Sequence, residues 1–528
     1  MLSFMSSGSK SPAVYILAAC LLAFAVASRI RLYLVRKAFK KEHGCQPIQA
    51  KWPIKDPIFA SDVMRSTLKR GREGTILEGA ADRFRRMGCY TYKYANFTTP
   101  VIATAEPENI KTILALRFKD YSLGMRKVAF TPLLGQGIFN SDGESWAHSR
   151  HIIRPSFVRD QVADLNTFER HIAYLFKAIP HDGSTVDLQE LFFRFTIDSA
   201  TEFLFGQSTN SLRVYKPGGG PQEDAAFAEA FAVAQSDVIV RGRMGNLAML
   251  TRDKKAQQAI KICHEYVDQF VDDAVRHNKM TDIEKKAAGS GEKYIFLHEL
   301  AKSMKDKKSM RYEALNVLLA GRDTTAGLLS NMFFELAKQP AIWAKLREEV
   351  AQFEGTPPTY EQLKSLKYLK WCMNESLRIH PVVPGNSRLA ERDTILPLGG
   401  GPNGTSPLFV PKGTLVTYSP WTMHRRPEFF GADVEVFHPE RWETLRPGWE
   451  YLPFNGGPRI CLGQQYALAE AGYVTVRLAM QFEKLESRQP GPWKEALQLT
   501  LSCGGGTKVG MYAKSQLMAQ KEKRAGFD

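Results

Sequence analysis

Cys461 lies in a loop whose residue types and spacing could hold a metal-bound sulfur. The loop reads FNGGPRICLG, in which Phe454, Gly457, Arg459 and Gly463 accompany the cysteine at the spacing F-x-x-G-x-R-x-C-x-G. The Gly-Gly-Pro turn lets backbone amides surround the sulfur, and the helix predicted after the cysteine presents its positive end to a thiolate. A chance match at five fixed positions is improbable, so the loop predicts a ligand cysteine rather than a buried structural one.

A second chemical signal lies inside a long apolar helix pattern. The stretch LLAGRDTTAGLLS, residues 318–330, places Gly321, Asp323 and Thr324 where a buried helix would carry apolar residues. Glycine costs about 1 kcal/mol relative to alanine inside a helix, and a buried carboxylate is unfavourable unless it is compensated. This local cost indicates that the helix has a function at this point besides packing.

The N-terminus predicts a membrane anchor. Residues 12–28 contain no charged side chain, which is at the short limit for a helix that spans a membrane. Six basic residues follow within 29–41, whereas only Lys10 precedes the apolar run. A cleaved signal peptide carries its basic residues at the start, so an uncleaved anchor is favoured over a signal peptide or a buried helix. The positive-inside rule places the chain after Arg29 in the cytosol.

Composition limits the partners and the compartment. The chain has 528 residues, is 44 % hydrophobic and carries a formal net charge of +16. The basic residues are dispersed and form no aromatic–basic recognition motif, so we expect no nucleic-acid partner. Membrane lipid or an acidic protein fits the charge. Seven cysteines without a CxxC pair or a zinc spacing indicate a reducing compartment.

The pattern along the chain predicts a mainly α fold with a minor β subdomain and a single N-terminal transmembrane helix. We expect an anchor with a basic stop-transfer segment over residues 1–37, a proline-containing linker over 38–60, and one large domain over 61–528. Long helical patterns dominate up to about residue 381. Short β-like pieces with glycine and proline turns follow.

Two details concern the C-terminal third. A last helix precedes a segment, residues 497–514, that is typical of a terminal hairpin. The letters GGGPNG at 399–404 fit G-x-G-x-x-G, but Pro402 interrupts the loop and a strand-like segment follows. A dinucleotide site needs a helix there, so we exclude one.

The cysteine loop resembles the haem-ligand loop of cytochrome P-450 enzymes. The resemblance implies the fold of that family, with the thiolate of Cys461 on the iron of haem b, where it favours O–O cleavage. It also implies that Phe454 and Gly463 lie against the cofactor, and that Arg459 binds a haem propionate.

Further matches occur in the order found in that family. Trp146 and Arg150, in DGESWAHSRH, match a W-x-x-x-R pair that binds haem propionates, and Arg388 matches another propionate ligand. Arginine suits this role because its guanidinium pairs bidentately with carboxylates.

A structural cluster is implied as well. Glu375 and Arg378, three residues apart in NESLR, share one face of a helix and alone would be an ordinary ion pair. Arg441, in FHPERW, matches the third member of the family's Glu-Arg-Arg cluster, which locks the segment that presents the cysteine loop.

The resemblance also assigns the polar centre of the long helix. The residues from Ala320 to Thr324 match A/G-G-x-D/E-T in the helix over the haem. Gly321 then leaves room for oxygen and substrate, Thr324 turns its hydroxyl toward oxygen, and Asp323 feeds the proton relay. The alternative is that Thr324 only bonds back to the carbonyl four residues earlier. We expect this helix over about 311–338, with a length of about 42 Å.

Several segments, among them PLLGQGIF, SRHIIRPSF and MHRRPEFFGADVEVFHPERW, are similar to the fungal alkane- and fatty-acid-hydroxylating branch. The resemblance implies an O2-dependent monooxygenase of the endoplasmic reticulum membrane that hydroxylates long aliphatic chains at the terminal carbon. No flavin or NADPH module fits in the remaining length, so the electrons of NADPH must come through a separate cytochrome P-450 reductase. Cytochrome b5 is a second candidate donor.

Other functions stay open at this point. They are a monooxygenase of a secondary metabolite, an aromatic compound or a steroid, a haem-thiolate isomerase or dehydratase, and a non-catalytic carrier. The intact Asp323-Thr324 pair disfavours the isomerase. Segments expected near the substrate are 116–140, 227–250, 315–325, 382–388 and 501–505, of which the second has a composition more typical of ordinary core.

Overall fold

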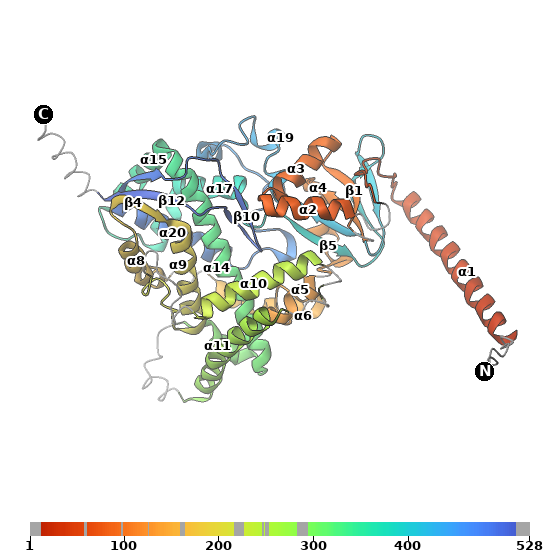
Figure 1. Ribbon diagram of the computed structural model, residues 1–528, viewed down its shortest axis with the longest axis horizontal. Coiled ribbons are helices and arrows are strands. Elements are labelled where there is room, and N and C mark those ends of the chain that lie inside the picture. Colours follow the sequence, from red (N-terminus) through yellow and green to blue (C-terminus); the bar gives the residue numbers. More distant parts are fainter. Residues whose placement is uncertain are drawn as a thin grey trace, which may run out of the picture.

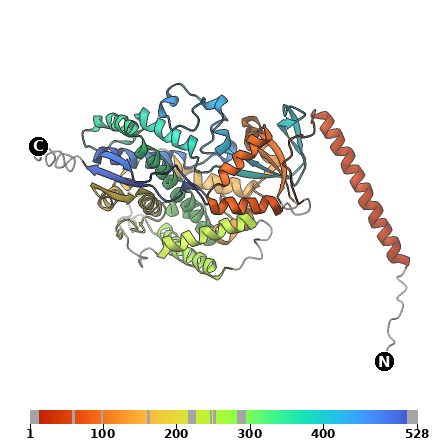
Figure 2. The same cartoon turned by 45° about the horizontal axis from the view of Figure 1, so that its top comes forward.

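Helix α1 (Pro12–Glu42) projects from the rest of the molecule as a single rod in the computed structural model (Figures 1 and 2). It has an apolar stretch with a mean hydropathy of 2.1, none of which is buried. By length and composition it is the one helix among the described residues that could cross a membrane. The helix continues to Glu42, five residues beyond the expected end of the anchor segment at residue 37.

The structure describes residues 12–56, 61–96, 99–124, 126–158, 164–215, 226–244, 248, 253–281 and 294–513. The helices after α1 are α2 (Ser61–Glu73), α3 (Ile76–Met87), α4 (Pro107–Lys111), α5 (Arg126–Leu134), α6 (Gly143–Ile153), α8 (Asn166–Ala178), α9 (Leu188–Phe205), α10 (Ala226–Met244), α11 (Lys254–Lys279), α13 (Phe296–Ser303), α14 (Lys307–Lys338), α15 (Pro340–Val350), α16 (Tyr360–Ser365), α17 (Lys367–Ile379), α18 (Pro420–Met423), α19 (Pro427–Phe430) and α20 (Gln464–Gln481).

The strands form a minor part of the fold, as expected. They are β1 (Thr91–Asn96), β2 (Thr99–Thr104), β3 (Tyr121–Ser122), β4 (Asp182–Asp187), β5 (Asn386–Ala390), β6 (Thr394–Gly400), β7 (Ser406–Val410), β8 (Leu415–Tyr418), β9 (Phe482–Ser487), β10 (Glu495–Leu497), β11 (Leu501–Cys503) and β12 (Lys508–Ala513). The largest sheet has the order β1-β2-β8-β5-β3, and a second has the order β4-β12-β9. The loop 399–404 joins the antiparallel strands β6 and β7, which confirms that it is not a dinucleotide site.

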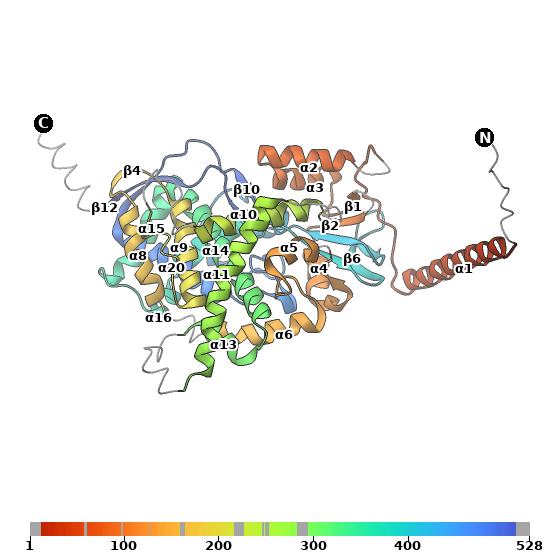
Figure 3. The same ribbon diagram turned by 60° about the horizontal axis from the view of Figure 1, so that its bottom comes forward.

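Helix α14 runs through the middle of the domain (Figures 1 and 3). It starts at Lys307, where the Asp306 carboxylate accepts a hydrogen bond from the backbone amide of Ser309 at 2.8 Å and so caps the helix. Helices α9, α11, α17 and α20 all contact it. Buried residues occur on every side of the helix, so its sequence lacks the apolar stripe of a surface helix.

The linker after α1 is attached to the domain by backbone pairing. Gln46 forms a parallel bridge with Leu408, Ile48 with Gly401, and Lys51 with Lys93. The amide of Gln46 donates to the carbonyl of Pro407 at 2.9 Å. The linker is therefore tied to the domain by isolated bridges and is not a free tether.

The expected C-terminal hairpin is wrong. Strand β11 pairs with β10, whereas β12 inserts between β4 and β9. The chain between them turns at the glycines 504–506, so the two apolar runs belong to different sheets. Alternation of apolar residues identified the strands but carries no information about which distant strand each one joins.

Glu375 lies at the centre of a buried ion cluster. Its carboxylate accepts two hydrogen bonds from the guanidinium of Arg378, at 2.9 and 2.8 Å, and one from Arg441 at 3.0 Å. The indole of Trp442 and the amide of His438 also donate to it, both at 2.9 Å. Glu375 and Arg378 are fully buried, so the structure brings together the three residues that the sequence analysis grouped.

Removal of the central carboxylate should destabilise the whole domain. In Glu375→Ala the buried Arg378 and Arg441 lose their shared counterion, and breaking a buried pair in this way costs about 3–5 kcal/mol. We expect this loss in the free energy of unfolding, measured by chemical denaturation. Glu73→Ala, which breaks the exposed Lys69–Glu73 pair, serves as the control and should cost less than about 1 kcal/mol. Equal effects of the two substitutions would contradict a structural role for the cluster.

Candidate functional site

A cavity lies against the middle of α14. Its walls come from α6, α9, α14, β5 and the cysteine loop, and most of the lining is apolar. The predicted site residues that line it are Trp146, Arg150, Thr324, Arg388, Phe454, Arg459 and Cys461. These positions span more than 300 residues of sequence, and the fold brings them to one space.

The cysteine loop depends on a close approach of two backbone segments. Gly457 has a φ of +67°, and a Cβ at this position would lie 2.0 Å from the carbonyl oxygen of Leu114. Only glycine fits there. The amide of Cys461 donates to the carbonyl of Phe454 at 3.0 Å, which closes the loop around the cysteine.

The Cys461 thiol lines the cavity just ahead of helix α20, which begins at Gln464. Burial has the larger effect and raises the pKa of the Cys461 thiol, whereas the amide of Gly463 and the charge of Arg150 lower it. The two lowering contacts are of the kind expected to favour a thiolate.

Four arginine side chains line the same cavity: Arg126, Arg150, Arg388 and Arg459. Arg126, which lies at the start of α5, was not among the predicted site residues. Among the described residues, one carboxylate is paired with this group, because Arg459 donates to Asp142 at 2.7 Å. Arg388 and Arg150 donate to backbone carbonyls, of Ser387 at 2.7 Å and of Ile460 at 3.0 Å.

Burial of this positive charge is costly without an anion. Burial, together with the neighbouring Arg388, lowers the pKa of Arg126 to about 10. Burial also lowers the pKa of Arg459 to about 10, assisted by nearby arginines and opposed by Asp142. A ligand with carboxylates on one edge would neutralise the cluster. Haem b, with two propionates on one edge and an iron that takes a thiolate, fits the arginines and Cys461 together.

On the facing helix, the hydroxyl of Thr324 lines the cavity and donates to the carbonyl of Ala320 at 2.6 Å. Gly321 lies one turn away on the same wall, and a Cβ there would meet nothing nearer than the Cβ of Ala200 at 3.7 Å. Because Gly321 has no side chain, this part of the wall stays open. The observed hydroxyl position is the back-bonded one that the sequence analysis gave as the alternative.

Asp323 lies behind the cavity wall and is buried. Its carboxylate accepts a hydrogen bond from the amide of Gln235 at 2.7 Å and one from the guanidinium of Arg322 at 3.3 Å. Burial raises the pKa of Asp323, whereas Arg322 and Gln235 oppose this effect. Gln235 belongs to α10, 88 residues earlier in the chain, and no local pattern could have predicted this contact.

Two further residues of α14 position the opposite wall. The carboxylate of Glu313 accepts from the amide of Ile138 at 3.1 Å, and the side-chain oxygen of Asn316 accepts from the amide of Phe139 at 3.0 Å. Ile138 and Phe139 thereby become part of the cavity lining. The two polar residues stand out in the apolar sequence of the helix, but their hydrogen-bond partners could not be predicted from that sequence.

Three of the five segments expected near the substrate contribute to the lining, namely 116–140, 315–325 and 382–388. None of the described residues of 227–250 or 501–505 lines the cavity. The side chains of Phe227, Phe231 and Val238 are buried in core against α11 instead, which confirms the interpretation of that stretch as ordinary core. Residues 245–247 and 249–250 of the stretch lie outside the described residues.

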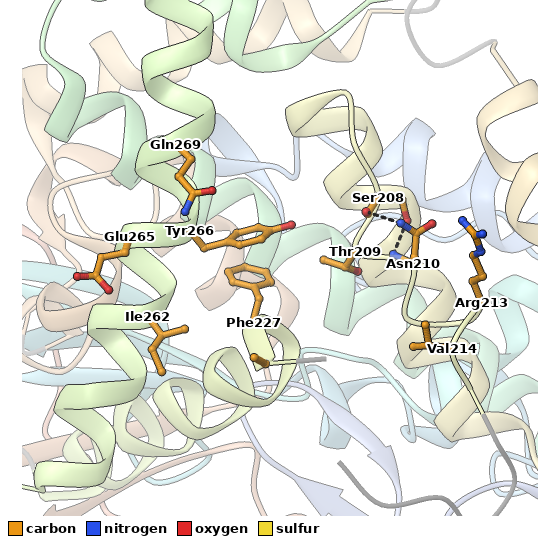
Figure 4. Close-up of a pocket in the computed structure, with 11 residues that line it drawn as sticks. Ser208, Thr209, Asn210, Arg213, Val214, Phe227, Ile262, Glu265, Tyr266 and Gln269 are labelled. Atoms are coloured by element: carbon orange, nitrogen blue, oxygen red, sulfur yellow. Dashed lines mark hydrogen bonds between the residues drawn. The ribbon is translucent and has the colours of Figure 1, made fainter. Parts of the chain in front are cut away.

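A second, more open cleft lies between the turn after α9 and helices α10 and α11 (Figure 4). The rings of Phe227 and Tyr266 stack in its centre, with centroids 4.1 Å apart, and Asn210 bonds to Ser208 at one side. None of the predicted site residues lies in this cleft. The predicted catalytic and cofactor-binding residues therefore lie in the cavity beside α14 and not in this cleft.

Comparison with known proteins gives matches over most of the chain. Residues 69–502 match the family described as Cytochrome P450. The chain is 50 % identical over 471 residues to cytochrome P450 monooxygenase himC of Aspergillus japonicus, covering 88 % of this chain and 83 % of that protein. It is 45 % identical to cytochrome P450 monooxygenase fsdH of Fusarium heterosporum, covering 95 % and 89 %. It is 43 % identical to cytochrome P450 52A12 of Debaryomyces hansenii, covering 94 % and 97 %.

The ligand role of Cys461 can be tested by spectroscopy. The reduced protein with carbon monoxide should show the absorption band of a thiolate-ligated haem, because the sulfur donates electron density to the iron. Cys461→Ser should abolish the band. Cys89→Ser, which alters a half-buried cysteine that does not line the cavity, should retain it. A Cys461→Ser protein with an unchanged spectrum would remove this residue from the site.

Proposed function

Because the chain belongs to the cytochrome P450 family, we propose that this monooxygenase hydroxylates long-chain aliphatic substrates, alkanes or fatty acids, at the terminal carbon. The observation that carries the proposal is the mainly apolar cavity in which Thr324 and Cys461 line one space. Relatives named 52A3-A and 52A12 are 47 % and 43 % identical to the chain. The sequence segments quoted above resemble the alkane- and fatty-acid-hydroxylating branch.

When bound, a thiolate-ligated haem supplies the activation of O2 that places one oxygen atom in a C–H bond and reduces the other to water. The residues of this chain supply the surroundings. Arg150, Arg388 and Arg459 would hold the propionates, and the guanidinium of Arg459 lies 4.4 Å from the centroid of the Trp146 ring. Arg126 adds a fourth cation at the same edge.

Proton delivery rests on α14. A carboxyl whose pKa is raised by burial is protonated closer to neutral pH than an exposed one, so Asp323 can hold a proton beside the cavity. Gln235 and Arg322 fix its orientation. Thr324, the next residue, carries its hydroxyl on the cavity wall and can pass the proton inward once it leaves the carbonyl of Ala320.

Positional selectivity has to come from the walls. A terminal methyl C–H bond is stronger than the methylene bonds beside it, so an unguided oxidant would attack inside the chain. Apolar side chains such as Ile138, Phe139 and Val382 narrow the cavity and present the chain end first. This is catalysis by positioning.

Membership of the family implies a separate redox partner. We propose an NADPH-dependent cytochrome P450 reductase, with cytochrome b5 as an additional donor, and the net charge of +16 is suited to an acidic flavoprotein. We propose the endoplasmic reticulum membrane as the location, with α1 as anchor over residues 1–37, the linker over 38–60 and the domain of 61–528 in the cytosol.

A second candidate is a monooxygenase of another hydrophobic substrate. It is favoured by the relatives himC and fsdH, whose names specify no substrate. The identity of himC, 50 %, exceeds that of 52A3-A, 47 %, and the identity of fsdH, 45 %, lies between those of 52A3-A and 52A12. Overall sequence identity therefore does not distinguish the two candidate functions. Analysis of the reaction products has to distinguish them.

Thr324→Ala should uncouple electron transfer from product formation. The variant should fold, bind haem and consume NADPH, but it should release several-fold more peroxide per product because the hydroxyl is lost from the cavity wall. Ser330→Ala is a matched control, since the Ser330 hydroxyl also bonds back to the carbonyl four residues earlier, at 2.6 Å, but does not line the cavity. If both variants stay coupled, Thr324 is only a helix residue.

Chromatography of products from saturated chains in the C12–C18 range, a range taken from the branch resemblance, should show the terminal alcohol as the main product. Phe139→Ala, which widens one wall, should raise the in-chain share. Mainly in-chain alcohols from the unmodified enzyme would contradict terminal selectivity. Good turnover of an aromatic or steroid beside none of any aliphatic chain would favour the second candidate.

A further inference from the structure

A basic cleft lies where α1 meets the folded domain. It has a volume of about 760 Å³ and is bounded by the C-terminal part of α1, the linker, β1 and the β6–β7 hairpin. Of the described residues that line it, none is acidic. The cationic ones are Arg29, Arg36, Lys37, Lys40, Lys51 and Lys93.

Most of this charge is not compensated by protein carboxylates. Arg36 pairs bidentately with Asp393, through two hydrogen bonds of 2.9 Å, and so fixes α1 to the domain. The Lys40 ammonium lies 4.8 Å from the centroid of the Phe409 ring. In the part of the chain that the structure describes, the other five cations of the cleft have no carboxylate within ion-pair distance. Such a concave cationic surface attracts an anion.

At the membrane end of the cleft, apolar side chains lie beside a single cation, Arg29. Arg29 directly follows the uncharged run of residues 12–28. Leu32 and Tyr33, one turn further, line the cleft and are 42 % and 64 % exposed. A ligand with an apolar part toward the membrane and an anionic part toward the domain matches this order. That is the arrangement of a phospholipid.

Two of the cations come from the folded domain. Lys51 lies in the linker and Lys93 in β1, and a parallel backbone bridge sets them side by side. A stop-transfer signal requires only basic residues that follow the apolar span in sequence. It does not require lysines from a separate strand to face the same cleft, so the cleft exceeds what insertion in the membrane needs.

We propose that this cleft binds the phosphate of an anionic phospholipid headgroup from the leaflet that faces the domain. The inference rests on the proposed membrane anchoring by α1. Lys40, Lys51 and Lys93 bind the phosphate, Leu32 and Tyr33 contact the glycerol and the upper acyl chain, and Arg36 positions the helix. Juxtamembrane lysines near a membrane surface each contribute to attraction of anionic lipid.

The full-length protein can be reconstituted in nanodiscs of phosphatidylcholine with a minor share of phosphatidic acid. Lipids retained after transfer to detergent are then counted by native mass spectrometry. We expect phosphatidic acid to be retained over phosphatidylcholine by at least about tenfold, and we expect the combined Lys40→Ala, Lys51→Ala and Lys93→Ala protein to lose this preference. All basic residues of 29–37 remain in this variant, so insertion is preserved.

The control removes the same charge elsewhere. Lys364, Lys367 and Lys370 are exposed on α16 and α17, outside the cleft, and their combined replacement by alanine should leave the preference intact. Equal loss in both variants would show unspecific charge attraction and overturn the proposal. Displacement of the lipid by inorganic phosphate would instead identify a site for a soluble anion. Recovery of the unmodified protein outside the nanodiscs would refute the anchor itself, and with it the lipid site.

Discussion

Helix α14 contacts α9, α11, α17 and α20, and one stretch of it also forms a wall of the cavity. The two tasks conflict, because packing favours large apolar side chains whereas the cavity needs open space and polar groups. The sequence separates them along the helix. Ala320, Gly321 and Thr324 face the cavity, and the turns on either side are buried in core. Three buried polar side chains of the helix, Glu313, Asn316 and Asp323, are each hydrogen-bonded by partners from another segment.

Buried arginines of two kinds distinguish structure from function in this molecule. Arg378 and Arg441 share the carboxylate of Glu375, and Arg378 also donates to the carbonyls of His424 and Val434, at 3.0 and 2.7 Å. Their charge is balanced within the protein. The arginines around the cavity instead bind mostly carbonyl and amide oxygens, which balance no charge. The first cluster has a buried carboxylate at its centre and the second does not, so the second is arranged for an anionic ligand.

Local features were predictable from sequence, and long-range pairings were not. The cysteine loop and the end of α14 at Lys338 could be identified because turns and helix periodicity are encoded within a few residues, whereas the helix starts at Lys307, four residues before the expected start at about 311. Cys461 was found from its loop, and Arg459 and Thr324 were assigned by the family resemblance. Gln235 and Arg126 escaped, because their significance lies in contacts with residues far along the chain. The wrong C-terminal hairpin has the same cause, since β11 and β12 each join a different sheet. Gly457 was recognisable as a turn glycine, but its close contact with Leu114 was not.

The attachment of α1 to the domain bears on how an apolar substrate reaches the cavity. Arg36 pairs with Asp393, Phe39 packs against Phe409 with centroids 5.7 Å apart, and the linker pairs with the β6–β7 hairpin through its backbone. A helix held at so many points cannot swivel freely, so a membrane that holds α1 also orients the domain. Long aliphatic chains partition into the bilayer and not into the cytosol. A fixed orientation therefore keeps one face of the domain at the membrane surface, where such chains are concentrated, and substrate delivery becomes a property of the attachment as well as of the cavity.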